Sequence, residues 1–229
     1  MHIWYNLHMS DFQYDIKKEY DAFLKERETT PMEFVMGNQV LYDMCKKYPH
    51  HDDTDIIVSK IWLIGRSYAA AIERRRNTKD EEISEDFMYN KVAPALKRRA
   101  KKLDRMIDEL NALEGDYKDN AKTVLELHKY LTDIFEDITG LEKRSLASKY
   151  LHFHCPDKVL IYDNRAKEAA RMTVHHPDVN PKWKNKYDEQ YADFYARIIA
   201  MVDEIGTHPT PREIDSFLLH HIIKLGGKS

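Results

Sequence analysis

Apolar residues recur at steps of three and four along much of the chain, which is the period of one face of an α-helix. The clearest pattern runs through residues 85–113, and a second runs from 120 to 139. The repeating positions are Met88, Val92, Leu96, Ala100, Leu103, Met106, Ile107, Leu110 and Leu113, then Val124, Leu127, Leu131, Ile134, Phe135 and Ile138. Gly115 follows the first run and Gly140 the second, as glycine often follows the last turn of a helix. The pattern predicts two long amphipathic helices.

Similar spacing covers residues 31–47, 55–76, 164–173, 184–205 and 211–225. Thr210, Pro211 and Glu213 supply a cap, a first-turn proline and an early acid, which is how a helix commonly begins. Only Val159–Tyr162 has the composition of a strand, and one short strand cannot make a sheet. The sequence therefore predicts an all-α protein, with connecting segments at 48–54, 77–84, 114–119 and 175–183.

Composition agrees with a helical fold. The chain has 229 residues and only seven glycines, which disfavours a β-rich fold or a glycine-rich phosphate loop. We expect a single domain over 1–229. The formal net charge of −3 gives no overall basic excess, so a nucleic acid would have to meet a local patch. Basic runs at 73–76 and 97–102 are such patches, or are the solvated faces of helices.

The two cysteines, Cys45 and Cys155, cannot build a zinc or iron–sulfur site alone. No apolar stretch approaches the length of a membrane span, and the chain does not begin with a secretory signal pattern. We expect a cytoplasmic protein with no membrane partner and no cofactor.

The histidines do not form a metal motif. His50, His51, Asp52 and Asp53 are adjacent on an expected loop and cannot all converge on one ion. His152 and His154 are two positions apart, which directs them to different faces of a helix. We therefore expect no metal site.

The segment ITGLEKRSLASKYLHFHCPDKVLIYDNRA, residues 138–166, resembles the hairpin and aspartate region of the helix–hairpin–helix DNA glycosylases. In that superfamily a glycine-containing hairpin precedes a helix that opens with a small-residue pair. A loop and an apolar run follow, and the catalytic aspartate begins the next helix. Here Leu146-Ala147 matches the small pair and Asp163 matches the aspartate, sixteen residues after Ala147. The hairpin keeps one glycine, Gly140, where the family usually has two.

The resemblance implies a two-lobed helical bundle. We expect lobe A to span 55–155 and lobe B to combine 1–54 with 156–229. It also implies a monofunctional DNA glycosylase, because Ser145 stands where bifunctional members carry a lysine nucleophile, eighteen residues before the aspartate. Lys143 and Lys149 flank Ser145, and we expect helical spacing to direct both away from it. The four-cysteine cluster loop of some members is missing.

Asp163 is the expected catalytic residue, because a buried anion stabilises the positive charge that develops on the sugar as an N-glycosidic bond breaks. The expected DNA-binding residues are Gly140, Lys143, Arg144, Ser145, Ser148 and Lys149. The expected base pocket contains Trp62, Arg66 and Tyr68. The partner would be double-stranded DNA with a modified or damaged base, held by a monomer that flips the base out, in repair or in antiviral defence.

Other interpretations stay open at this point. Asp163 before a helix is also a common N-cap, and the two roles are compatible. A helical DNA-binding or regulatory protein could keep the same scaffold without catalysis. A third class is a helical toxin or nuclease that uses the histidines.

Overall fold

The computed structural model describes residues 15–29, 35–74, 87–175, 177, 183 and 185–224. Within these ranges every regular element is helical and no strand occurs, which confirms the all-α prediction. The elements are α1 (Ile16–Thr29), α2 (Val35–Lys47), α3 (Thr54–Ser67), the π-helical turn η1 (Met88–Val92), α4 (Ala93–Ala112), α5 (Ala121–Thr139), α6 (Arg144–His154), α7 (Asn164–Thr173), α8 (Glu189–Ile205) and α9 (Pro211–Lys224). The expected linker at 77–84 and the basic residues Arg75 and Arg76 lie outside the described residues.

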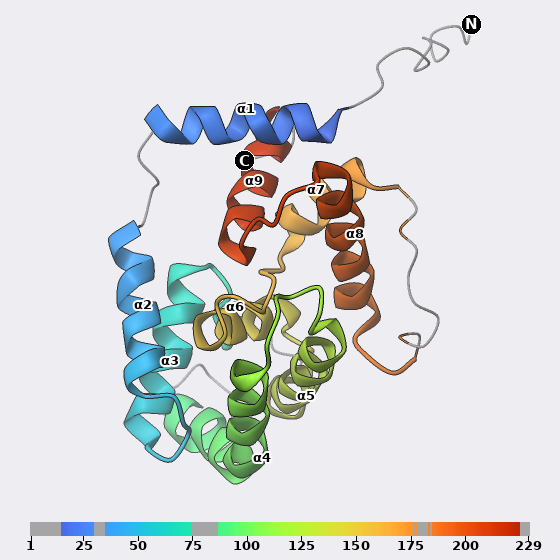
Figure 1. Ribbon diagram of the computed structural model, residues 1–229. Coiled ribbons are helices and arrows are strands. Elements are labelled where there is room, and N and C mark those ends of the chain that lie inside the picture. The colour runs from blue at the N-terminus through green and yellow to red at the C-terminus, as the bar shows by residue number, and fades with distance from the viewer. Residues whose placement is uncertain are drawn as a thin grey trace, which may run out of the picture.

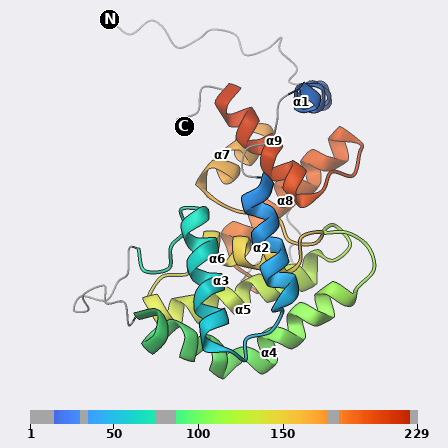
Figure 2. The same cartoon turned by 90° about the vertical axis from the view of Figure 1, so that its left-hand side faces the viewer.

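Helix α6 lies at the centre of the molecule, in contact with α2, α3 and α5 (Figure 1). Its residues from Leu146 to His154 are all buried, so it has no solvent face. Helices α4 and α5 pack together below it, whereas α1, α7, α8 and α9 form a second group above it (Figure 2). The site described below lies where α6 meets α7 and α9.

The two long amphipathic helices occur where the apolar pattern predicts them. Leu103 and Ile107 of α4 are buried, as are Leu131 and Phe135 of α5. Gly140 ends α5 with a left-handed backbone at φ 70°, and its N–H donates to the Glu136 carbonyl at 2.7 Å. A residue with a side chain would be strained in that conformation, so the glycine explains the sharp helix end.

Helix α3 is shorter than predicted, because the chain doubles back after Ser67. Ala70 donates its N–H to the Gly65 carbonyl at 2.8 Å, and Ala69 is left-handed at φ 51°. A β-carbon on Gly65 would lie 3.2 Å from the α-carbon of Ala71. The absence of a side chain at Gly65 therefore lets the turn pack closely on the helix.

Two features of the fold differ from the expectations. Helix α1 was not predicted, although Ile16, Tyr20 and Phe23 have helical spacing and are buried against α8 and α9. Helix α2 packs on α3 and α6, so residues 35–54 belong with the helices expected in lobe A, not with lobe B. A boundary at residue 55 therefore does not describe the packing.

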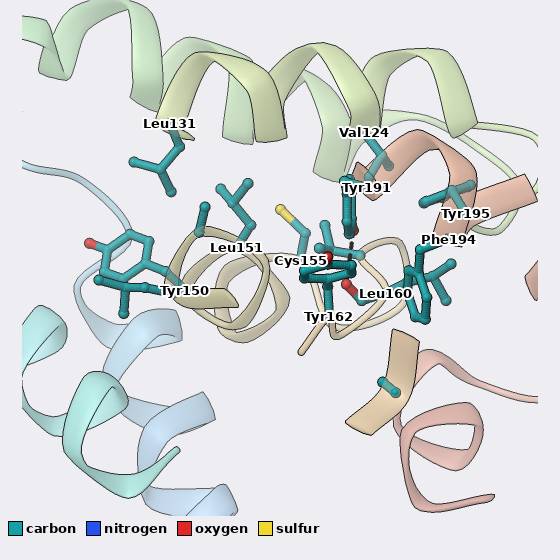
Figure 3. Packing of buried hydrophobic residues seen from close by; sticks show 14 of the residues in the cluster. Val124, Leu131, Tyr150, Leu151, Cys155, Leu160, Tyr162, Tyr191, Phe194 and Tyr195 are labelled. Atoms are coloured by element: carbon teal, nitrogen blue, oxygen red, sulfur yellow. Dashed lines mark hydrogen bonds between the residues drawn. The ribbon is translucent and has the colours of Figure 1, made fainter. Parts of the chain in front are cut away.

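The segment after α6 is covered by large side chains from α8. Tyr191, Phe194 and Tyr195 of α8 surround the buried Leu160 and Tyr162 (Figure 3). This packing holds the chain just before Asp163. None of the described helices has the length and apolar character that crossing a membrane requires.

Candidate functional site

The apolar run Val159–Tyr162 is buried without a partner strand, so side chains must satisfy its backbone polar groups. Ser148 accepts from the Tyr162 N–H at 3.0 Å and lies 3.1 Å from the Tyr162 carbonyl. The Tyr191 hydroxyl donates to the Leu160 carbonyl at 2.8 Å, the dashed contact in Figure 3. His152 donates from Nδ1 to the Val159 carbonyl at 2.9 Å. The run is thus anchored immediately before Asp163.

The two oxygens of the Asp163 carboxylate have different partners. Oδ1 accepts from the N–H groups of Arg165 and Ala166, both at 3.0 Å, and so caps α7. Oδ2 lies 3.0 Å from the ammonium of Lys149. The Asp163 side chain is 26% exposed, so the carboxylate is neither fully covered nor used only as a cap. This confirms the N-cap prediction and leaves the second oxygen facing the site.

Burial alone would raise the pKa of Asp163, but Lys149 and the N–H groups of α7 outweigh it and hold the pKa below its usual value. The Lys149 side chain is only 4% exposed. Its ammonium also reaches Ser145 Oγ at 3.1 Å and the Tyr68 carbonyl at 3.3 Å. Three oxygens therefore surround the Lys149 ammonium. Because its pKa is lowered, Asp163 is a carboxylate at neutral pH.

A second carboxylate and cation lie beside the first pair. Arg212 Nη1 of α9 is 3.2 Å from Asp215 Oδ2. The Arg212 guanidinium faces the rings of Tyr42, Tyr68 and Phe153, with its central carbon 5.6–5.8 Å from each centroid. Asp215 is buried, and burial raises its pKa to about 6 although Arg212 opposes the shift. The two aspartates of the site thus ionise in different pH ranges.

Tyr42 connects Arg212 to the anchored segment. Its hydroxyl accepts from Arg212 Nε at 3.1 Å and Nη2 at 3.0 Å. The same hydroxyl lies 2.6 Å from His152 Nε2. Because Nδ1 of His152 donates to a carbonyl and burial lowers the pKa of this histidine to about 3, the ring is neutral and Nε2 accepts. The chain of hydrogen bonds that runs from Arg212 through Tyr42 and His152 to Val159 therefore has a defined donor and acceptor at each step.

The expected DNA-binding residues separate into two groups. Gly140, Lys143 and Arg144 lie at the α5–α6 turn, where Lys143 is left-handed at φ 49° and donates to the Arg74 carbonyl. Arg144 pairs with Asp188, the N-cap of α8, at 2.5 Å. Ser148 and Lys149 are buried instead and bind the chain itself, which differs from the expected phosphate contacts. Ser145 is half-buried and contacts Lys149.

The expected base-pocket residues are not all at the site. Tyr68 contacts both Lys149 and Arg212. Trp62 and Arg66 lie on the exposed face of α3, where Arg66 pairs with Glu73 and its guanidinium lies 6.0 Å from the Trp62 ring centroid. The described contacts of Trp62 and Arg66 thus do not include Asp163.

Sequence reasoning missed Tyr42, Arg212 and Asp215. A signal for Asp215 was present, because it follows Ile214 and precedes Phe217 and Leu218 on the buried face of α9. An acid at such a position needs a buried partner. Arg212, three residues earlier, is that partner.

A second buried polar cluster lies between α3, α4 and α6. His51 donates to Asp104 at 2.5 Å and accepts from the Tyr150 hydroxyl at 2.6 Å. Lys60 donates to the carbonyls of Tyr48 at 2.9 Å and His50 at 3.2 Å. These contacts fix the α2–α3 loop on the core. Across the described ranges, no three His, Cys, Asp or Glu side chains are placed to hold a metal ion.

Comparisons with protein-family models, with curated proteins and with solved structures find no match for this chain.

Proposed function

We propose that this protein is a monofunctional DNA glycosylase of the helix–hairpin–helix type, with Asp163 as its catalytic carboxylate. The observation that carries the proposal is that the two oxygens of Asp163 have different contacts. One oxygen caps α7, and the other faces Lys149 at a partly exposed position. A turn that contains Gly140 and the left-handed Lys143 precedes α6, and the resemblance implies a glycine-containing hairpin at this position. The two-lobed glycosylase arrangement is part of the same proposal.

The chemistry follows from the charge of Asp163. As the bond between C1′ and the base nitrogen breaks, positive charge grows on the sugar ring. A carboxylate that is already ionised and fixed by α7 stabilises that charge without reorganising. The same oxygen can orient the water that adds to C1′. Lys149 helps to hold Asp163 in its ionised form.

Asp163→Asn tests the proposal while it keeps the cap of α7, because asparagine is as good an N-cap as aspartate. We expect base release to fall by on the order of 10²–10³, since the transition state loses its charge stabilisation. DNA binding should persist. The measurement is single-turnover release from duplexes that carry a panel of modified bases, with freed bases identified by mass.

Asp53→Asn is the matched control. Asp53 caps α3 by accepting from the N–H groups of Asp55 at 2.8 Å and Ile56 at 3.0 Å, and it is exposed. This variant should keep wild-type release. Equal release by wild type and the Asp163 variant would contradict the catalytic role. Tight binding without release by wild type would favour a non-catalytic DNA-binding protein.

A further inference from the structure

Two pairs of opposite charges share the ring of Tyr68. Lys149 Nζ and Arg212 Cζ each lie 5.6 Å from its centroid. Lys149 is paired with Asp163 at the start of α7, and Arg212 with Asp215 in the first turns of α9. Helices α7 and α9 pack against each other (Figure 1). The site therefore contains two carboxyl groups, although the sequence predicts only one.

The two carboxyl groups have different surroundings. Asp163 accepts two backbone N–H groups and an ammonium. Asp215 is only 7% exposed and is 3.2 Å from one guanidinium nitrogen, Nη1. The other two nitrogens of Arg212 donate to Tyr42. Asp215 thus has weaker stabilisation of its anion than Asp163 has.

The charged groups around Asp215 come from three helices. Arg212 of α9 and Lys149 of α6 lower the pKa of Asp215, whereas burial and the Asp163 carboxylate of α7 raise it. The net effect is an acid that still holds its proton in part near pH 6. Hydrolysis of a glycosidic bond commonly uses one ionised carboxylate and one protonated carboxylic acid, each in a different role.

We propose that Asp215 donates a proton to the leaving base, with Arg212 and Tyr42 as positioning residues. This inference rests on the proposed glycosylase function. When the bond from C1′ to the base breaks, its electron pair goes to the base nitrogen, and the base takes the Asp215 proton. Water then adds to C1′ and loses a proton to Asp163, which passes it to solvent. Asp215 regains its proton from solvent.

The substrate class follows from this role. A proton donor contributes most when the base is a poor leaving group, because departure of such a base as an anion is costly. A base that already carries positive charge, such as an N-alkylated purine, needs no such donor. We therefore expect neutral modified bases as substrates, with N-alkylated cationic bases depending little on Asp215.

The first test needs no catalysis. Carbon-13 NMR of the aspartate carboxyl groups in the full chain should give Asp215 a pKa raised to about 6. In Asp163→Asn this midpoint should fall, because a negative neighbour is removed. A midpoint for Asp215 at ordinary aspartate values, or one that does not move in the variant, would overturn the proposal.

The second test measures single-turnover release of a neutral modified base between pH 5 and 8. Wild-type release should decline as pH rises through the Asp215 midpoint. Asp215→Asn should lose this limb and release the base about 10²-fold more slowly at pH 6. Asp193→Asn is the control, since Asp193 forms a partly buried pair with Arg197 on α8 at 2.9 Å, away from the proposed site. Circular dichroism checks that both variants fold.

Three outcomes are distinct. An unchanged pH profile in Asp215→Asn overturns the proton-donor role and leaves the glycosylase proposal in place. An equal loss of release from neutral and cationic bases also overturns it, because a purely structural role would affect both. Absence of release by wild type at every pH overturns the proposed function and the donor role together.

Discussion

The ammonium of Lys149 lies 3.1 Å from the hydroxyl of Ser145, one helical turn earlier on α6. The sequence argument that helical spacing directs Lys149 away from Ser145 is therefore wrong, because residues at i and i+4 share a face. The amine lies close to the place that the nucleophilic lysine of bifunctional glycosylases would occupy. Its chemistry must be decided by its environment and not by its position.

We expect that environment to keep Lys149 from acting as a nucleophile. Its nitrogen is engaged in an ion pair with the Asp163 carboxylate at 3.0 Å. The Ser145 hydroxyl and the Tyr68 carbonyl complete its three contacts. We predict that borohydride added during turnover traps no protein–DNA adduct, and that product strands break only after alkali. Gel electrophoresis of the reaction measures both.

Lys149→Ala and Lys143→Ala are the variants that interpret this experiment. An adduct that forms in wild type and Lys143→Ala but disappears in Lys149→Ala would show a bifunctional enzyme that uses Lys149. Such a result would replace the monofunctional assignment while leaving Asp163 at the centre of the site.

The site residues differ in how far their roles can be predicted from the sequence. Asp163 as the cap of α7 is readable from the local pattern, since an aspartate before an amphipathic helix is a common N-cap. The sequence contains a signal for the buried pair of Asp215 and Arg212 but not for its place in the site, because the pair meets Tyr42 and Tyr68 only through contacts between distant helices. Ser148 and Lys149 look like surface residues in the sequence, but α6 is buried on all sides.

The turn between α5 and α6 carries two left-handed residues of different kinds. Gly140 adopts φ 70° at no steric cost, whereas Lys143 adopts φ 49° with a side chain. A non-glycine residue in this region costs about 1–2 kcal/mol. The backbone strain at Lys143 lowers the stability of the fold, whereas its side chain is expected to favour DNA binding through a phosphate contact.

We predict that Lys143→Gly raises the free energy of unfolding by about 1 kcal/mol while it weakens DNA binding. If Lys143 contacts a phosphate, the variant should bind all sequences less tightly and lower the salt slope by about one. Urea unfolding and fluorescence anisotropy over a salt series measure the two effects.

Asn185→Gly supplies the control, because Asn185 is also left-handed, at φ 59°, and exposed. It should stabilise the fold and leave DNA binding unchanged. A Lys143→Gly protein with unaltered binding would remove Lys143 from the proposed DNA interface.

The sequence predicted a helix correctly where that helix has a single, long apolar stripe. Residues 164–173 form a helix as predicted, and α4, α5 and α9 match their patterns closely. The prediction failed where tertiary contact decides the end of a helix, as at Gly65 and Ala69 of the α3 turn. It also failed for α1, whose short stripe is buried only by the distant helices α8 and α9.

The whole molecule buries several neutral histidines. Burial lowers the pKa of His128 to about 4 and that of His152 to about 3, and it holds the pKa of His154 well below its ordinary value. In the unfolded chain these groups bind protons near pH 6.5. Since the unfolded state binds more protons, their contribution to stability is complete above pH 6.5 and is lost progressively below it.

We predict that the free energy of unfolding falls as pH is lowered from 6.5 toward 5. Each buried histidine contributes up to about 1.4 kcal/mol per pH unit. Asp215 opposes them, because its raised pKa lets the folded state bind a proton in the same range. Urea unfolding at a series of pH values gives the slope.

His128→Gln isolates one contribution. His128 stacks on Tyr191 with ring centroids 3.7 Å apart, so the variant loses some stability at every pH. The slope of its unfolding free energy against pH below 6.5 should be shallower than that of wild type, because unfolding takes up about one proton fewer. His208→Gln, at an exposed position, should keep the wild-type slope. Equal slopes for the His128 variant and wild type would contradict the linkage.

The contact between Tyr42 and Arg212 joins residues that are 170 positions apart in the chain. A ribosome delivers α2 early, and α9 is the last of the described helices to emerge. Asp163 and Lys149 can meet before that, but Arg212 and Asp215 join them only when synthesis reaches α9. A half-made chain of the proposed enzyme would therefore hold its first carboxylate without its proton donor. Such a chain would release neutral modified bases only slowly until α9 has joined the site.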